Sequence, residues 1–273
     1  MLRRERLEIK TPDQIRLMRA SGLVTAAALA AVREAVVPGA VAGDIDHLAE
    51  TVIRDHGAEP NFLGYAGYPA SICLSINDVV VHGIPKRQVI HEGDIVSIDC
   101  GAVLHGWHSD AAITIPVGDV NARSDCLVEV TRVSLWDGIA AYARAQHLNE
   151  VGAAVEASVL AGEPSFGVLQ DYIGHGIGTE MHMDPEVPNY AVRDRGPKVR
   201  PGLVVAIEPM VVEGRIATVT ESDGWTVRTV DGRWAAHWEH TVARTDDGVW
   251  VLTAEDGGAG ELAARGVTIA PLE

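Results

Sequence analysis

The sequence has few cysteines, and they form no motif. Its 273 residues include three, Cys73, Cys100 and Cys126, and no two of them are spaced as Cys-x-x-Cys. A sparse, odd set argues against a disulfide framework and against a structural zinc site built on cysteine, and it is typical of a reducing compartment. We therefore expect a cytoplasmic protein without disulfide bonds.

Positive charge is also scarce. Lysine and arginine total 22 residues against 38 aspartates and glutamates, which gives a formal net charge of -16. Without a basic stripe that could displace counterions, direct binding to nucleic acid or to an anionic membrane is not expected. The hydrophobic share of 47% and the length are those of a globular protein with a sizeable core, in one large domain or two small ones.

Several familiar signals are missing as well. The first residues, Met1-Leu-Arg-Arg-Glu-Arg, are too charged for a secretory signal, and the apolar stretch at residues 23–32 is too short to span a bilayer. No Gly-x-Ser-x-Gly motif is present, which weakens the case for a serine hydrolase. The glycines at 174, 176 and 178 have neither the spacing of a dinucleotide-binding motif nor the lysine of a phosphate-binding loop.

The apolar pattern of the chain predicts a mixture of helices and strands. Thr11-Pro12-Asp13 marks the start of a long helix that Pro38-Gly39 ends, and the other expected helices are at about residues 44–56, 122–145 and 151–161. After a loop at 57–70, strands are expected at 71–76, 94–100 and 107–116 and through most of the last hundred residues. From Gly257 onward a loose tail is expected.

A faint internal repeat indicates two similar halves. Asp99 lies six residues after Gly93, as Glu208 lies six residues after Gly202, and both intervening runs are mainly apolar. Each acid is followed by a later His-x-acid, at His108-Ser-Asp110 and at His237-Trp-Glu239. We infer two α+β halves whose sheets meet at the acids; coincidence in a glycine-rich chain is the alternative interpretation.

Four carboxylates and one imidazole are placed for metal binding: Asp99, Asp110, His175, Glu208 and Glu239. Asp99 and Asp110 fall on consecutive strands with a short connection, so a hairpin would put both on one face. Acids gathered in an interior repel one another unless cations hold them. One nitrogen among many oxygens suits Mn, Fe, Co or Zn, and bridging carboxylates allow two ions, which would turn a bound water into hydroxide near neutral pH.

With these residues the chain resembles the type I methionine aminopeptidases. The shared motifs run from about residue 9 to residue 252, nearly the whole chain: Phe62-Leu-Gly-Tyr-Ala-Gly-Tyr-Pro-Ala-Ser71, Ser75-Ile-Asn-Asp-Val-Val-Val-His-Gly-Ile-Pro85, Ser97-Ile-Asp-Cys-Gly101, Gly174-His-Gly-Ile-Gly178, Ile207-Glu-Pro-Met210 and Trp238-Glu-His-Thr241. The resemblance implies the α+β pita-bread fold, with two pseudo-symmetric α/β halves, antiparallel sheet and helices outside. We expect one catalytic domain at residues 1–256, with halves at about 11–120 and 121–254, and a C-terminal tail at 257–273.

The resemblance also implies an activity. Family members are dinuclear metallo-exopeptidases that remove the initiator methionine from nascent polypeptides with a small second residue, through a metal-bridging hydroxide that attacks the first peptide bond. The family's metal ligands fall on the five residues named above. His82 matches the histidine near the substrate's amine, His182 the one that hydrogen-bonds the scissile carbonyl, and Glu208 the ligand that also moves the nucleophile's proton.

Further expectations follow from the same resemblance. The methionine side chain would lie in an apolar pocket that corresponds to Phe62, Tyr65, Tyr68, Cys73, Met181 and Trp225. Some relatives have cysteine in place of Phe62 and phenylalanine in place of Met181. Two divalent ions (Co, Mn, Fe or Zn) are implied, and a monovalent cation near the backbone oxygens of Asn77, Val79 and Ala235 is a further candidate. The expected partners are nascent chain N-termini, with the ribosome as the place of encounter, and the enzyme is expected to be a monomer.

Other interpretations stay open at this point. Taken singly, His82 and His182 are ordinary loop histidines, and Tyr65, Tyr68 and Trp225 are core aromatics. Proline-specific peptidases share the implied fold and ligands but usually add an N-terminal domain. A non-catalytic binding module on the same fold would be expected to have broken ligands. A two-metal phosphatase would need cationic phosphate clamps, and the motifs contain no lysine or arginine at their centres.

Overall fold

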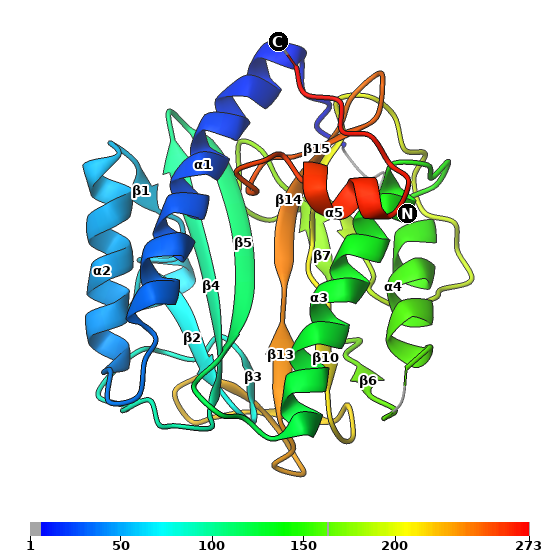
Figure 1. Cartoon of the computed structure of the whole chain (residues 1–273). Coiled ribbons are helices and arrows are strands. Elements are labelled where there is room, and N and C mark those ends of the chain that lie inside the picture. Colours follow the sequence, from blue (N-terminus) through cyan, green and yellow to red (C-terminus); the bar gives the residue numbers. More distant parts are fainter. Residues whose placement is uncertain (1–6, 163, 273) are drawn as a thin grey trace.

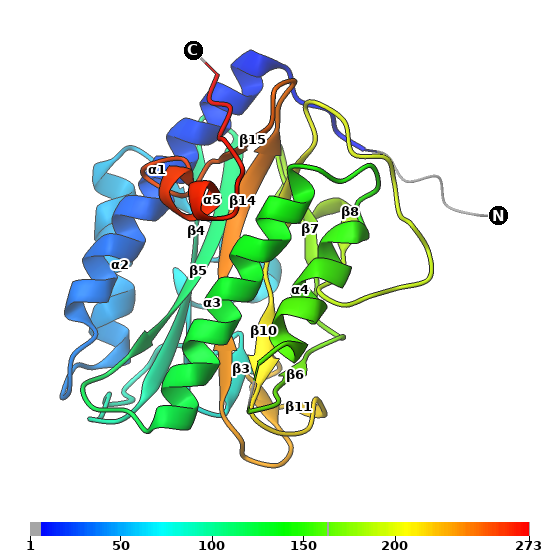
Figure 2. The ribbon, with the colours of Figure 1, turned by 45° about the vertical axis from the view of Figure 1, so that its right-hand side comes forward.

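The structure is a computed structural model of the chain and describes residues 7–162 and 164–272. The charged segment at residues 1–6, which argued against a secretory signal, lies outside the described residues. Four long helices cover one face of an antiparallel sheet and come in two neighbouring pairs, α1 with α2 and α3 with α4 (Figure 1; Figure 2). Their bounds are Pro12–Ala35 for α1, Ala42–Asp55 for α2, Ala122–Tyr142 for α3 and Glu150–Leu160 for α4.

The main sheet has nine strands among the described residues, in the order β1-β4-β5-β14-β9-β7-β8, with β2 beside β4 and β15 beside β14. Its strands are β1 Glu59–Pro60, β2 Ile72–Ile76, β4 Ile95–Leu104, β5 Trp107–Pro116, β7 Gly174–Gly176, β8 Met183–Val187, β9 Val204–Ile207, β14 Glu239–Arg244 and β15 Val249–Val251. Two three-stranded sheets accompany it. One joins β13 Ala235–His237, β10 Met210–Val212 and β6 Gly167–Val168; the other joins β11 Thr218–Thr220, β12 Val227–Thr229 and β3 Val79–Val81.

The strand order places two similar groups of strands side by side. The first half of the chain contributes β2, β4 and β5, and the second contributes β7, β9 and β14; the two groups meet where β5 pairs with β14. That seam has two paired positions, Glu239 with Ala112 and His240 with Ala111. This is the arrangement that the internal repeat predicted, although the division into halves at about residue 120 stays a prediction.

Helix α1 begins where the sequence predicted. The Thr11 hydroxyl accepts the backbone N–H of Gln14, and the Gln14 side chain accepts the backbone N–H of Thr11, so both ends of a capping box are present. Among the described residues this is the one helix long and apolar enough to cross a membrane by length and composition. Its inner face, which includes Met18, Ala28 and Val32, is fully buried in the core, and that burial accounts for the apolar composition.

The predicted elements agree with the structure except at their ends. The helices expected at 44–56, 122–145 and 151–161 and the strands expected at 71–76, 94–100 and 107–116 are all present, and β4 continues to Leu104. The segment 57–70 is a loop apart from β1 and a 3-10 turn, η1, at Tyr65–Gly67. The last hundred residues are mainly short strands and turns, as expected.

The loose tail expected from Gly257 is not what the structure shows. Residues Ala259–Ala264 form a helix, α5, that packs on α3, and its Leu262 is fully buried. Gly257 and Gly258 take left-handed conformations (φ 67° and 88°), and a side chain at Gly258 would meet Val251. The glycines therefore turn the chain into α5, and their abundance was wrongly interpreted as a sign of looseness.

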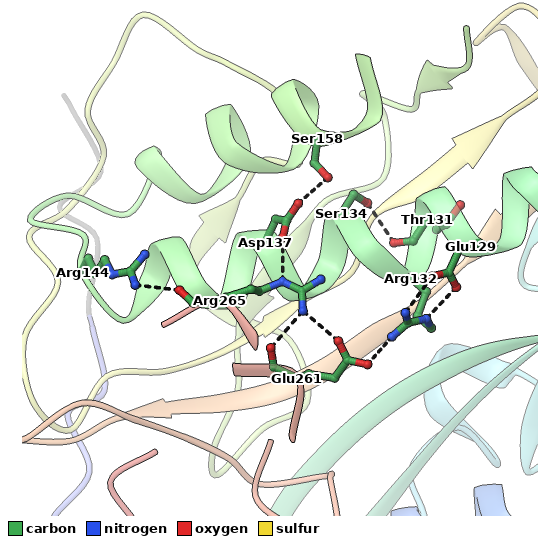
Figure 3. Close-up of polar contacts among 9 residues, drawn as sticks. All are labelled: Glu129, Thr131, Arg132, Ser134, Asp137, Arg144, Ser158, Glu261 and Arg265. Atoms are coloured by element: carbon green, nitrogen blue, oxygen red, sulfur yellow. Dashed lines mark hydrogen bonds and ion pairs between the residues drawn. The ribbon is translucent and has the colours of Figure 1, made fainter. Parts of the chain in front are cut away.

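Charged side chains fix α5 in place (Figure 3). Arg265 donates to Asp137 of α3 (2.6 Å) and to Glu261 (2.7 Å), and Arg132 of α3 donates to both Glu261 and Glu129. We call these five residues the α3–α5 network. Ser158 of α4 also donates to Asp137 (2.6 Å), so the network joins three helices.

Candidate metal centre and active site

Asp99 and Asp110 lie on the hairpin of β4 and β5, as predicted. Asp99 is paired with Ala112 and Asp110 with Gly101, so the two side chains are diagonal neighbours on one face of the sheet. Thr241 of β14 fixes the backbone at Asp110, because its hydroxyl accepts the Asp110 N–H (3.0 Å) and donates to the Asp110 carbonyl (2.8 Å). The hairpin is thereby attached to the second half of the sheet at the acid itself.

Glu208 and Glu239 come from the other half. Glu208 directly follows β9, and Asn189 donates to its carbonyl oxygen (3.1 Å). Glu239 is the first residue of β14, and since it is paired with Ala112, as Asp99 is, it lies beside the hairpin acids. We call Asp99, Asp110, Glu208 and Glu239 the cavity acids.

His175 completes the predicted set from the middle of β7. The flanking glycines bring its strand close to its neighbours: a side-chain carbon at Gly174 would lie 2.3 Å from the carbonyl oxygen of Ala206. Its Nδ1 is 3.0 Å from the Gly176 carbonyl oxygen, an arrangement in which Nδ1–H donates and Nε2 keeps its lone pair. That Nε2 lies 3.5 Å from a Glu208 oxygen.

The cavity acids are held in surroundings that disfavour their charge. Burial raises the pKa of Asp99 to about 7. Burial, together with repulsion from the neighbouring acids, raises the pKa values of Asp110, Glu208 and Glu239 well above their ordinary range. Among the described residues that line this cavity, none is a lysine or an arginine. The cavity acids therefore lack a positive side chain to offset their charge.

The unpaired atoms fit metal ions. Asp99 Oδ1, Asp110 Oδ1 and Glu239 Oε1 are buried without a hydrogen-bond partner among the described residues. Two groups have donor atoms that all lie within 4.8 Å of one another: Asp110, His175 and Glu239 form one, and Glu208, His237 and Glu239 form the other. Both groups contain Glu239, a carboxylate with two oxygens. Divalent cations would supply the missing positive charge and the missing partners.

His82 and His182 lie at the same cavity. The His82 ring is edge-on to Trp225 and to Tyr172, and burial lowers the pKa of His82 to about 4. His182 is exposed, hydrogen-bonded to the Tyr65 hydroxyl through Nδ1 (2.8 Å), and its ring lies 5.3 Å from that of Tyr65. Both imidazoles are therefore held at the cavity with nitrogen atoms that can reach a bound molecule.

An apolar pocket adjoins the acids. The cavity has a volume of about 290 Å³, and all six residues predicted for the methionine pocket line it: Phe62, Tyr65, Tyr68, Cys73, Met181 and Trp225. Phe62, Tyr68, Cys73 and Met181 are buried together as one apolar cluster, against which Trp225 packs. The Tyr68 ring is edge-on to those of Phe62 and Trp225. Phe62 and Met181, the two positions at which this chain differs from some relatives, are therefore part of an apolar pocket.

Some residues at the cavity were not predicted. Asp171, Tyr172 and Ile173 line it from the loop before β7, where the sequence carries no motif. His237 was noted only as part of the internal repeat, although its spacing of two from Glu239 places both side chains on one face of an extended strand. His108, the other histidine of the repeat, bonds Asn61 through Nδ1 (2.6 Å).

Comparison with known proteins agrees with this geometry. Residues 16–246 match the profile of Metallopeptidase family M24. The chain is 53% identical over 249 residues to methionine aminopeptidase 1 of Mycobacterium tuberculosis, covering 89% of this chain and 94% of the relative. The crystal structure of methionine aminopeptidase from Thermotoga maritima is similar with a TM-score of 0.88 at 42% identity, covering 92% of this chain and 100% of that one.

A more distant likeness concerns the fold alone. Prolidase from Pyrococcus furiosus has a TM-score of 0.72 at 22% identity, over 90% of this chain but 65% of the prolidase. The pita-bread fold expected from the sequence is therefore confirmed, with antiparallel strands inside and helices outside.

Proposed function

We propose an active site for a chain that belongs to metallopeptidase family M24 and, within it, to the methionine aminopeptidases. The site is the cavity that the cavity acids line, and there the enzyme removes the N-terminal methionine of its substrates. The observation that carries this proposal is the set of buried, unpartnered carboxylate oxygens at the end of an apolar pocket. One feature supplies a place for metal ions and the other a place for a thioether side chain.

The enzyme uses divalent metal, and the proposal concerns which residues hold it. We assign a pair of ions to five residues: Asp99, Asp110, His175, Glu208 and Glu239. Carboxylate oxygens with imidazole nitrogen and no thiolate suit Co, Mn, Fe or Zn. When bound, such ions supply a water nucleophile that ionises near neutral pH and polarise the scissile carbonyl. Each of these five residues lies on a strand of the sheet or directly beside one. The backbone therefore holds their donor atoms in place before the substrate binds.

Three side chains move or position protons in this scheme. Glu208 accepts the nucleophile's proton, because its carboxylate belongs to the proposed metal group and lines the cavity. His182 donates a hydrogen bond to the scissile carbonyl as negative charge develops there, and Tyr65 fixes its ring through Nδ1. His82, which also lines the cavity, orients the scissile amide.

The substrate is an unblocked N-terminus. The methionine side chain enters the pocket of Phe62, Tyr68, Cys73 and Met181. A free α-amine could act as a ligand to a metal ion held by the cavity acids, which would explain an exopeptidase reaction. We propose a small second residue, nascent chains as substrates and the ribosome as the place of encounter. The proposal further includes a cytoplasmic monomer, one catalytic domain at residues 1–256, and a monovalent cation near Asn77, Val79 and Ala235.

The alternatives have less support. A non-catalytic module would have lost ligands, and all five positions carry ligand-type side chains. A phosphatase would need cationic clamps, and no described residue lining the cavity is a lysine or an arginine. A proline-specific peptidase has the fold, but the identity to prolidase is 22%.

A metal titration with matched peptides tests the proposal. Protein dialysed against chelator is titrated with Co²⁺, Mn²⁺, Fe²⁺ or Zn²⁺, and hydrolysis of Met-Ala-Ser, Leu-Ala-Ser and Ala-Pro is followed. We expect no turnover without metal and a strong preference for Met-Ala-Ser with it. Full turnover in chelator would refute the metal centre, and preference for Ala-Pro would refute the substrate.

A further inference from the structure

His237 stands at the metal group without an assigned role. It ends β13, and Trp238 separates it from Glu239 at the start of β14. His237 and Glu239 are both 2% exposed, and their nearest nitrogen and oxygen, His237 Nε2 and Glu239 Oε2, are 3.9 Å apart. At that distance no hydrogen bond joins them.

The nitrogen of His237 that faces the acids has no partner. Nε2 is buried and makes no hydrogen bond among the described residues, and the donor atoms of His237, Glu208 and Glu239 lie within 4.8 Å of one another. Glu239 Oε1 is likewise buried without a partner. An imidazole lone pair and carboxylate oxygens that converge without touching leave a space that a cation fills.

The ring is placed there by a rigid backbone. The His237 N–H donates to the Thr114 hydroxyl (2.9 Å), and that hydroxyl lies 2.8 Å from the His237 carbonyl oxygen. Ser97 hydrogen-bonds the same Thr114 hydroxyl from β4 (2.8 Å), and His237 is paired with Met210 in the small sheet. Three strands therefore fix the Cα of His237, so its ring cannot move far from Glu239.

We propose that His237 is a sixth metal ligand, which binds through Nε2 the ion shared with Glu208 and Glu239. The inference rests on the proposed metal centre and adds to it. His175 with Asp110 and Glu239 would form one group of donors, and His237 with Glu208 and Glu239 the other, so each ion would have one imidazole, with Asp99 as a further carboxylate ligand. The imidazole nitrogen of His237 would favour Co, Fe or Zn over Mn for the ion that it binds.

Cobalt binding tests the assignment independently of turnover. In the Co²⁺-loaded wild-type protein each coordinated imidazole has one exchangeable, hyperfine-shifted N–H proton resonance, so two are expected, one from His175 and one from His237. His237→Gln should lose one resonance. Calorimetry should show that the variant binds one of the two ions about 10–100-fold more weakly than the wild type does. Gln retains a hydrogen-bond donor, so a role limited to donating to Glu208 or Glu239 would leave the affinity nearly unchanged.

A matched control and a second variant complete the test. The control is His240→Gln, which changes another buried histidine. His240 follows Glu239 in the sequence, but its ring hydrogen-bonds Thr253 and is not part of the donor groups. This variant should keep both resonances and both metal affinities. His237→Asn should behave as His237→Gln, and thermal unfolding of the metal-free variants reports whether they fold. If neither folds, the number of wild-type resonances decides.

The failures are distinguishable. Wild-type protein that binds no Co²⁺ would overturn the proposed metal centre as a whole. Wild-type protein that binds Co²⁺ with a single resonance, or a His237→Gln protein with unchanged affinity and spectrum, would overturn the assignment of His237 alone.

Discussion

The cavity acids and the α3–α5 network each gather carboxylates from distant parts of the chain, but the two clusters are neutralised differently. In the network, Glu129, Asp137 and Glu261 each accept from an arginine, and the pKa of Glu129 is lowered by its bond to Arg132 (Figure 3). At the cavity, the acids have raised pKa values and unpartnered oxygens. Paired acids stabilise the fold, whereas buried acids without a cationic side chain reserve a place for a ligand.

The largest expected effect comes from removing one cavity acid. Glu208→Gln should lower kcat by about 10²–10⁴-fold, because it removes a proposed metal ligand that is also the proposed proton acceptor. The measurement is steady-state hydrolysis of Met-Ala-Ser at saturating metal. Glu129→Gln in the network is the matched control and should leave kcat unchanged; a Glu208→Gln enzyme of near-normal kcat would contradict the role of Glu208.

The second test uses the pH dependence of the metal-free protein. The folded protein holds a proton on Asp99 up to about pH 7, whereas the unfolded chain loses it near the ordinary pKa of 3.8. The contribution of Asp99 to the stability of the metal-free protein should therefore fall as the pH rises through this window, whereas buried histidines with lowered pKa values, such as His175 and His237, contribute with the opposite sign. Glu129 has the opposite sign: its pKa is lowered, so its small contribution is present above the ordinary value of 4.5 and is lost on acidification.

Urea unfolding of chelator-treated protein over this pH range measures the effect. The stability of wild type relative to Asp99→Asn isolates the Asp99 contribution and should decline towards neutral pH, and saturating metal should reverse this trend, since bound ions require ionised carboxylates. A stability difference between wild type and Asp99→Asn that stays constant from acid to neutral pH would contradict the contrast between the two clusters.

A smaller effect is expected from the network. Arg265→Gln removes charged hydrogen bonds to Asp137 and Glu261 from a side chain that is 16% exposed, and should lower the free energy of unfolding by about 1.5–3 kcal/mol. Urea unfolding measures it, with Arg16→Gln, an exposed partner of Asp13, as the control. Because α5 does not line the cavity, kcat and metal affinity should stay at the wild-type values.

The smallest effect is expected from Arg132→Gln. Its partner Glu129 is 58% exposed, and Arg265 still holds Glu261, so the cost should be about 0.2–1 kcal/mol in the same urea assay. A loss as large as that of Arg265→Gln would mean that burial does not govern the strength of these pairs.

The contrast also explains what the sequence could predict. Asp99 and Asp110 were predictable because strand periodicity and a short connection fix which face each side chain takes. The charged partners of α5, Arg132 and Asp137, come from α3, more than a hundred residues away, and neither spacing nor periodicity connects them to it. Gly257 and Gly258 misled the prediction, because glycine marks a tight turn and a disordered end alike.

His237 shows a signal that was available and not used. The spacing of two from Glu239 predicts a common face on an extended strand, which holds even though Trp238 separates two strands in different sheets. What the sequence could not supply is the clamp by Thr114, a contact across 123 residues that fixes where the ring lies. Asp171 and Tyr172 were not predicted for a different reason: they lie in a loop, which has no periodicity from which the direction of a side chain could be inferred.

The seam between β5 and β14 has a consequence for how the molecule is held together. Two backbone pairings join the halves there, beside acids contributed by both. Neither half carries all the proposed donors, so an ion bound by donors from both would join the halves across this seam. Fragments cut between the halves would each lack part of the proposed donor set.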